Sequence, residues 1–272
     1  MGRIVFVTDV DGTLDYRCTG IANKVIESAR DFVSRGGKLA LATGRAIVSS
    51  KDIAKDLHVN APSILYGGTM IYDFNKEQQL WTCPLSHGIL EIAKEIVITF
   101  PDISLLAFSD MGIYILNENE MLWKKGIPQE CDHRFCSKEI SGNLLKLNFC
   151  GEHERIEQLR DTYFTNEIYN FSFSSHHFAE VVSSKAGKGI AIRVLSRLLN
   201  IPLQNFVAMG DAQNDMEMLQ LAGTSFAVGN ATEPLKSVAD YILPHCSEEG
   251  AAEGFAYAKR LLYPPKNMVN ML

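Results

Sequence analysis

The stretch IVFVTDVDGT at residues 4–13 decides the fold, because a short apolar run ends there in two closely spaced aspartates. Apolar runs of this length are typical of strands buried in a parallel sheet. Similar runs, each followed by a loop or a helix, occupy residues 39–42, 63–65, 206–209 and 225–228. Amphipathic patterns predict helices at residues 21–33 and 189–199. This alternation predicts an α/β fold built on a doubly wound parallel sheet.

The middle of the chain has a different pattern. It mixes helical stretches with strands of alternating polarity, such as those at residues 144–149 and 178–182. We therefore expect an inserted α+β domain at residues 83–182, which divides the core into residues 1–82 and 183–272. Two strand-like linkers bound the insertion, and paired linkers suit a hinged lid.

Composition narrows the classes of partner. The formal net charge is -6 and the pI is near 5.7, whereas a nucleic-acid or anionic-membrane partner would favour a basic surface. No stretch approaches the roughly 20 apolar residues that span a bilayer, and the apolar start is too short for a signal peptide. We expect a cytoplasmic protein with no nucleic-acid or membrane partner, and the oligomeric state stays open.

Polar residues gather where three of the predicted strands end. DVDGT at residues 9–13 follows the first strand, TGR at residues 43–45 follows the second, and GDAQND at residues 210–215 follows a later one. Ligands of open α/β sheets bind beyond the carboxyl ends of the strands. These three segments are therefore the predicted site.

The acids of this site predict a metal ion. If residues 211–215 form a helical turn, Asp211 and Asp215 lie on one face and point toward Asp9 and Asp11. Four negative charges in a partly desolvated cleft repel each other unless some are protonated or a cation binds. Oxygen ligands with few carboxylates suit Mg²⁺, which also accepts a substrate phosphate oxygen.

Lys188 points to the same chemistry. It stands at the start of the predicted helix at residues 189–199, where the helix dipole disfavours a cation. A lysine beside free helix amides makes sense if an anion such as a phosphoryl group docks between them.

These motifs, in this order, resemble the haloacid dehalogenase superfamily, and specifically its Cof-type hydrolases. In that group a cap is inserted between the second and third motifs. The motifs are DVDGT at residues 9–13, Thr43, Lys188, and GD with ND within residues 210–215. The resemblance covers essentially the whole chain. It implies a Rossmann-type core, the inserted cap and a Mg²⁺-dependent phosphatase that acts on a small phosphorylated metabolite, such as a sugar phosphate.

The resemblance also implies catalytic roles. Asp9 would attack phosphorus and form an aspartyl phosphate. Asp11 would protonate the leaving alcohol and then deprotonate the attacking water. Thr43 would donate a hydrogen bond to a phosphoryl oxygen, and Lys188 would neutralise both nucleophile and phosphate.

It further implies the ligands of the metal and of the phosphate. Mg²⁺ would be held by Asp9, the backbone carbonyl of Asp11 and Asp211, with Asp215 or Asn214 contributing directly or through water. Asp215 would also orient Lys188. The remaining predicted substrate or phosphate contacts are Gly12, Thr13, Gly44, Arg45 and Asn214, although Arg45 could equally be a surface residue.

Two alternatives and one departure remain. An aspartate at position 11 favours hydrolysis, because related phosphotransfer ATPases have a threonine there. The phosphoryl group of the aspartyl phosphate could nevertheless pass to another hydroxyl, as in a phosphomutase or phosphotransferase. Alternatively, the chain could be a catalytically quiet domain that binds a phosphorylated ligand. Gly67 stands where many relatives have asparagine, which removes any contact that the amide would make.

Overall fold

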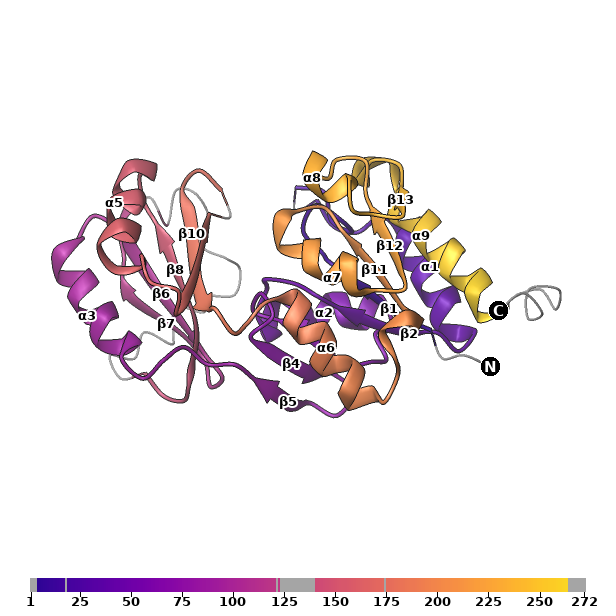
Figure 1. The fold of residues 1–272 in the computed structure, drawn as a ribbon, viewed down its shortest axis with the longest axis horizontal. Helices are drawn as coiled ribbons and strands as arrows, with labels where there is room; N and C mark the ends of the chain where they lie inside the picture. Colours follow the sequence, from indigo (N-terminus) through magenta and orange to yellow (C-terminus); the bar gives the residue numbers. More distant parts are fainter. Residues whose placement is uncertain (1–3, 18, 121, 123–139, 174, 264–272) are drawn as a thin grey trace. The chain divides into compact units, whose positions relative to one another are not determined.

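The computed structural model describes residues 4–17, 19–120, 122, 140–173 and 175–263. The chain divides into two compact units (Figure 1). The first comprises Met1–Trp81 and Gly187–Leu272, and the second comprises Thr82–Ala186.

The first unit is built on a five-stranded parallel sheet of order β13-β12-β11-β1-β2. Its strands are β1 (Val5–Thr8), β2 (Lys38–Leu41), β11 (Phe206–Gly210), β12 (Thr224–Ala227) and β13 (Tyr241–Ile242). Its helices are α1 (Asn23–Ser34), α2 (Ile47–Asp56), α6 (Lys188–Leu199), α7 (Met216–Leu221), α8 (Glu233–Lys236) and α9 (Ala251–Leu262), with short 3₁₀ turns at η2 (Leu203–Asn205), η3 (Gln213–Asp215) and η4 (Cys246–Glu248). Helices α1 and α9 lie side by side on one face of the sheet, and α6 and α7 cover the other (Figure 1). The predicted doubly wound α/β fold is confirmed.

Aromatic packing fixes β1, an interior strand of this sheet. Phe6 is fully buried, and its ring lies 4.5 Å from that of Phe255 on α9 and 5.9 Å from that of Phe32 on α1. Burying one such side chain stabilises a fold by about 1.5–3 kcal/mol. Strand β1, which precedes the first aspartate motif, is therefore packed against α1 and α9 on one face of the sheet.

One predicted strand belongs elsewhere. The run at residues 63–65 was expected in the parallel sheet, but β3 (Ser63–Leu65) pairs antiparallel with β4 (Met70–Asp73) in a separate three-stranded sheet completed by β5 (Gln78–Thr82). Tyr66, Gly67 and Gly68 all have positive φ, so the chain reverses immediately after β3. A parallel bridge between Ala42 and Ile64 lies beside β3 where the chain leaves β2.

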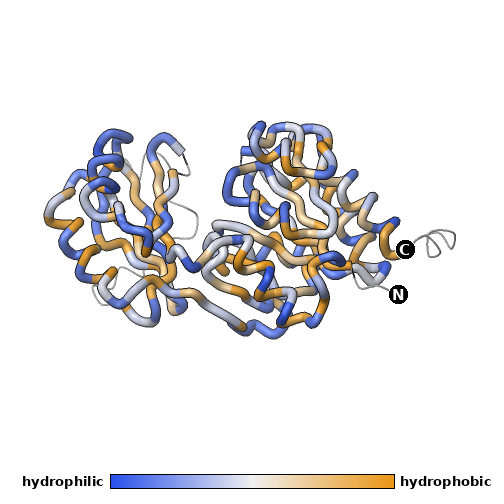
Figure 2. The backbone as a smooth tube through the Cα atoms, viewed as in Figure 1, coloured by the Kyte–Doolittle hydropathy of each residue, from blue (hydrophilic) through white to orange (hydrophobic). Residues whose placement is uncertain are grey.

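The second unit is a five-stranded sheet of order β7-β6-β8-β10-β9, antiparallel at each described pairing. Its strands are β6 (Ser104–Ser109), β7 (Ile113–Asn117), β8 (Leu144–Cys150), β9 (Tyr169–Phe173) and β10 (Phe178–Ser183), and its helices include α3 (Ile89–Thr99) and α5 (His153–Tyr163). Hydrophobic and hydrophilic residues alternate along α3 (Figure 2), whose buried face packs on the sheet. This part of the chain is α+β in architecture.

Within the described ranges, no helix combines the length and the apolar character needed to cross a bilayer.

Candidate active site

The three strand-end motifs meet at one edge of the parallel sheet. Strand β1 lies between β11 and β2, and all three run in the same direction. Asp9 follows β1, Thr43 lies two residues beyond β2, and Asp211 follows β11. Parallel neighbours present their carboxyl ends together, so the sheet topology collects these residues.

Lys188 is the centre of the acidic cluster. Its Nζ donates to Oδ1 of Asp9 at 2.6 Å and to Oδ1 of Asp215 at 2.7 Å. The lysine and both aspartate side chains are buried, with at most 7% of any of them exposed. One ammonium group therefore connects the loop after β1 to the turn after β11 from the first residue of α6.

Two backbone features put Lys188 there. Helix α6 follows Gly187, and a Cβ on Gly68 would come within 2.2 Å of the Gly187 backbone. The hairpin between β3 and β4 thus packs directly on the chain that enters α6, which only a glycine permits. Sequence reasoning missed Gly68, since its role depends on a contact between distant segments.

Asp215 is fixed by its second oxygen. Oδ2 accepts hydrogen bonds from the backbone N–H groups of Asp211 and Ala212 at 3.1 and 3.2 Å. Gly210 leaves room for this carboxylate, since a Cβ there would lie 2.5 Å from the carboxyl carbon of Asp215. Both oxygens of Asp215 are therefore engaged, which suits a residue that orients Lys188.

Burial sets the electrostatics of the cluster. Desolvation raises the pKa of Asp9 well above its ordinary value, although Lys188 opposes the shift and the neighbouring Asp215 and Asp211 reinforce it. The pKa of Asp211 is also raised, by burial and then by Asp215. Burial opposes the charge of Lys188, yet Asp215 and Asp9 keep its pKa above the ordinary value, so the lysine stays protonated.

This donor set fits a divalent cation. Oxygens of Asp9, Asp211 and Asp215 all lie within 4.8 Å of one another. Three carboxylates against one ammonium give 3 − 1 = 2 net negative charges when all are ionised, which is costly in a buried site unless a cation binds. Among the residues that the structure describes, no other group of three His, Cys, Asp or Glu side chains could share an ion. All-oxygen ligands suit Mg²⁺.

The turn after Asp9 is shaped around Asp211. Gly12 has φ +82°, and a Cβ there would lie 2.3 Å from Oδ2 of Asp211. Thr13 donates through Oγ1 to Oδ1 of Asp211 at 3.2 Å. Asn230 Nδ2 donates to the carbonyl of Gly12 at 2.7 Å, and its Oδ1 accepts from the Cys246 N–H at 2.9 Å. Asn230 was missed as a site residue, because nothing local to it signals a contact with residue 12.

Asp11 lies apart from the buried acids. Its side chain is 51% exposed and pairs with Arg45, whose Nη2 is 2.5 Å from Oδ1 of Asp11. Arg45 Nη2 also contacts Oδ2 of Asp15 at 3.3 Å. Arg45 is thus a partner of Asp11 rather than an isolated surface residue, and Asp15 is a further residue that sequence reasoning missed.

The other predicted residues fall into two groups. Thr43 is fully buried, and its Oγ1 accepts the N–H of Arg45 at 3.1 Å, while Gly44 is partly buried in the same loop. Asn214 is exposed and lies directly before Asp215 in η3. Gly67 occupies the β3–β4 turn with φ +70° and donates its N–H to the Thr43 carbonyl at 3.0 Å.

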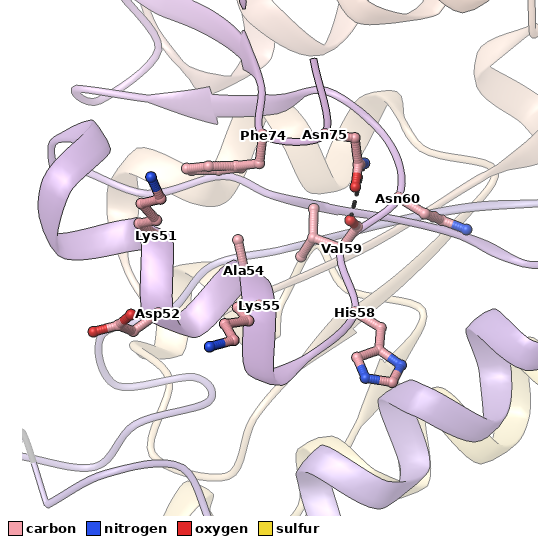
Figure 3. Close-up of a pocket in the computed structure, with 9 residues that line it drawn as sticks. All are labelled: Lys51, Asp52, Ala54, Lys55, His58, Val59, Asn60, Phe74 and Asn75. Carbon is pink, nitrogen blue, oxygen red and sulfur yellow. Dashed lines mark hydrogen bonds between the residues drawn. The ribbon is translucent and has the colours of Figure 1, made fainter. Parts of the chain in front are cut away.

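A pocket of about 530 Å³ lies elsewhere on the first unit (Figure 3). It is lined by residues of α2 and of the loops that follow α2 and β4, including Lys51, Lys55, His58 and Phe74. None of the predicted site residues lines it, so the acidic cluster is not part of this pocket.

Comparison with known proteins agrees with this arrangement. The model of the haloacid dehalogenase-like hydrolase family matches residues 6–255. An HMP-PP phosphatase of Serratia proteamaculans (strain 568) is 26% identical over 280 residues, which cover 95% of this chain and 97% of that protein. One of Klebsiella pneumoniae (strain 342) is 29% identical, with 87% of this chain and 86% of that protein covered. A haloacid dehalogenase-like hydrolase from Bacteroides thetaiotaomicron has the same fold, with a TM-score of 0.83 at 24% identity over 94% of this chain and 99% of the other. The chain belongs to the haloacid dehalogenase-like hydrolase family.

Proposed function

We propose that this chain is a Mg²⁺-dependent phosphatase that hydrolyses a small phosphorylated metabolite through an aspartyl phosphate on Asp9. The observation that carries the proposal is the bridge from Lys188 to Asp9 and Asp215, with Asp211 close enough to share an ion with both aspartates. Relatives that match 87% and 95% of the chain are HMP-PP phosphatases, which supports a small phosphorylated metabolite as substrate.

The first half-reaction transfers the phosphoryl group to the protein. A carboxylate oxygen of Asp9 attacks phosphorus in line as the bond from phosphorus to the leaving oxygen breaks. Asp11, two residues along the same loop, gives a proton to the leaving oxygen. Lys188 offsets the negative charge that the nucleophile and the phosphoryl group bring together.

The second half-reaction regenerates Asp9. Asp11 accepts a proton from a water molecule whose oxygen bonds to phosphorus, and the bond between phosphorus and Asp9 breaks to release phosphate. Thr43, whose Oγ1 accepts the N–H of Arg45 and keeps its own proton to donate, is the side-chain hydrogen-bond donor for a phosphoryl oxygen. Asp11 can act as the base for the attacking water, which is what hydrolysis requires.

Mg²⁺ would be held by Asp9, the carbonyl of Asp11 and Asp211. Asp215 would act mainly through Lys188 and the loop amides, since both of its oxygens already accept hydrogen bonds. When bound, the ion would neutralise negative charge on the transferring phosphoryl group. We further propose that residues 83–182 form a cap domain.

The test is release of inorganic phosphate, first from an aryl phosphate and then from a panel of phosphorylated metabolites, with and without Mg²⁺. The wild-type protein is expected to require Mg²⁺. Asp9→Asn keeps the size of the side chain but removes the nucleophile, and activity is expected to fall by at least about 1,000-fold. Undiminished turnover by Asp9→Asn would refute the nucleophile, and a wild-type protein inactive on every compound would favour a quiet binding domain. Product analysis with a sugar bisphosphate would detect transfer to a second hydroxyl.

A further inference from the structure

Arg45 donates hydrogen bonds to the Asp11 carboxylate from two nitrogens of its guanidinium group. Nη2 lies 2.5 Å from Oδ1, and Nε lies 3.1 Å from each carboxylate oxygen. Within the described residues, Arg45 is the source of every hydrogen bond to this carboxylate. The two residues come from the loops after β1 and β2, which are neighbours in the sheet. The orientation of the exposed Asp11 side chain is therefore set from the adjacent loop.

Arg45 is in turn anchored by Asp15. Nη2 of Arg45 lies 3.3 Å from Oδ2 of Asp15, a side chain that is 8% exposed. Oδ1 of Asp15 accepts a hydrogen bond from the N–H of Gly20 at 3.0 Å. The backbone carbonyl of Asp15 accepts one from the N–H of Gly12 at 2.9 Å. Asp15 is thus fixed by the turn that also carries the aspartate motif.

We propose that Asp15 and Arg45 are positioning residues, which together hold the Asp11 carboxyl group in place for proton transfer. The proposal rests on the acid and base role of Asp11 given above. The buried Asp15 fixes the guanidinium group, and the planar fork of that group then fixes the two oxygens of Asp11.

The charges favour positioning over direct phosphate binding. Arg45 contributes one positive charge between two carboxylates, so the group of three carries a net charge of 1 − 2 = −1 when ionised. An isolated surface ion pair would do little to fix the position of Asp11. Here, however, Arg45 also pairs with the buried Asp15, which restrains the guanidinium group. Proton transfer depends on a carboxyl group within hydrogen-bond reach of the leaving oxygen, so the restraint acts on the reaction itself.

The test uses the leaving group as the readout. A nitrophenolate departs without a proton, whereas the alkoxide of a sugar or glycerol needs one from Asp11. The value of kcat/KM reports the steps through phosphoryl transfer, so it is measured for p-nitrophenyl phosphate and for an alkyl phosphate at saturating Mg²⁺. Misplacing Asp11 should slow the alkyl substrate selectively.

For Arg45→Ala we expect kcat/KM to fall by about 30-fold to 100-fold on the alkyl phosphate and by less than about 3-fold on the aryl phosphate. Arg45→Lys keeps the charge without the fork and should lie between Arg45→Ala and the wild type. Asp15→Asn keeps an acceptor for Gly20 and should lose about 5-fold on the alkyl phosphate alone. The matched control is Arg35→Ala, which removes an exposed pair with Asp31 at the far end of α1 and should change neither value.

A double-mutant cycle of Arg45→Ala and Asp11→Asn tests whether Arg45 acts through Asp11. If Arg45 acts through Asp11, adding Arg45→Ala to Asp11→Asn should cause little further loss on the alkyl phosphate. Equal losses on both substrates, or a full further loss in the double variant, would mean that Arg45 binds the phosphoryl group and would overturn the proposal. Failure of the underlying function looks different, because Asp11→Asn itself would then show no preference between leaving groups. Unchanged thermal unfolding of Arg45→Lys and Asp15→Asn would exclude a general loss of folding.

Discussion

Replacing Lys188 with methionine tests the electrostatic basis of the site. The change keeps a long side chain but leaves Asp9 and Asp215 buried without their shared ammonium group, which lies 2.6 and 2.7 Å from them. Removing one partner of a buried ion pair typically costs about 3–5 kcal/mol. That is a large share of the about 5–15 kcal/mol that stabilises a typical native protein.

The cost should depend on pH. Burial raises the pKa of Asp9 in the folded protein, while Lys188 opposes the rise. A carboxyl group whose pKa is raised on folding contributes stability that is fully present below its unfolded pKa and is lost as the pH rises to its folded pKa. Without Lys188 the pKa of Asp9 should rise further, so the window of destabilisation extends toward neutral pH. The deficit in unfolding free energy should therefore be larger at about pH 8 than at about pH 5.5.

Urea unfolding in metal-free buffer at both pH values measures this difference. Lys51→Met is the matched control, because Lys51 pairs with Glu77 while 66% and 68% of the two side chains are exposed, and it should leave unfolding nearly unchanged. A Lys188→Met protein that unfolds at the wild-type urea midpoint at about pH 8 would refute the idea that this lysine offsets buried negative charge.

Three other predictions concern the same region. Gly12→Ala should destabilise the protein by about 1–3 kcal/mol and weaken Mg²⁺ binding by calorimetry, whereas Gly36→Ala, with a similar φ of +95° but nothing within 4 Å of its new Cβ, should change stability without affecting Mg²⁺. Mg²⁺ at 100 times its dissociation constant should raise the unfolding free energy by about 2.7 kcal/mol. At that same Mg²⁺ concentration the gain should shrink in Asp211→Asn and toward acid pH, because burial raises the pKa of Asp211 and protons then compete with the ion; a pH-independent gain would contradict this prediction. Burial, together with nearby acids, raises the pKa of the Cys246 thiol to about 11, so its thiolate at neutral pH is roughly one-hundredth of that of an ordinary cysteine. Iodoacetamide should therefore alkylate Cys246 slowly until the protein unfolds, and rapid labelling of the folded protein would show that the thiol is accessible and ionised.

Local patterns in the sequence were enough to predict four of the five strands of the parallel sheet. Apolar runs that end in acids or hydroxyls located Asp9, Asp211 and Thr43, and a lysine at a helix start located Lys188, since each signal lies within a few residues of the strand or helix concerned. The motif order supplied the family, which the comparisons confirm.

What the sequence could not reveal depends on contacts between distant segments. The strand at residues 63–65 has the same apolar character whether it joins the parallel sheet or a hairpin, and the positive φ values at Tyr66 to Gly68 decide between them. Asp15 and Asn230 are ordinary loop residues by type, and their roles follow from hydrogen bonds to Gly20 and Gly12 that only the folded chain makes.

The separation along the chain of Asp9 and its partners has a consequence for synthesis. Lys188 lies 179 residues after Asp9, and β1 needs the central strand β11 (Phe206–Gly210) as its neighbour on one side. A ribosome-bound chain that ends inside the second unit therefore has a nucleophile without its lysine and a sheet without its middle. Nascent or truncated chains should be inert toward phosphate esters, and hydrolysis should begin only once the last third of the protein has been made and folded.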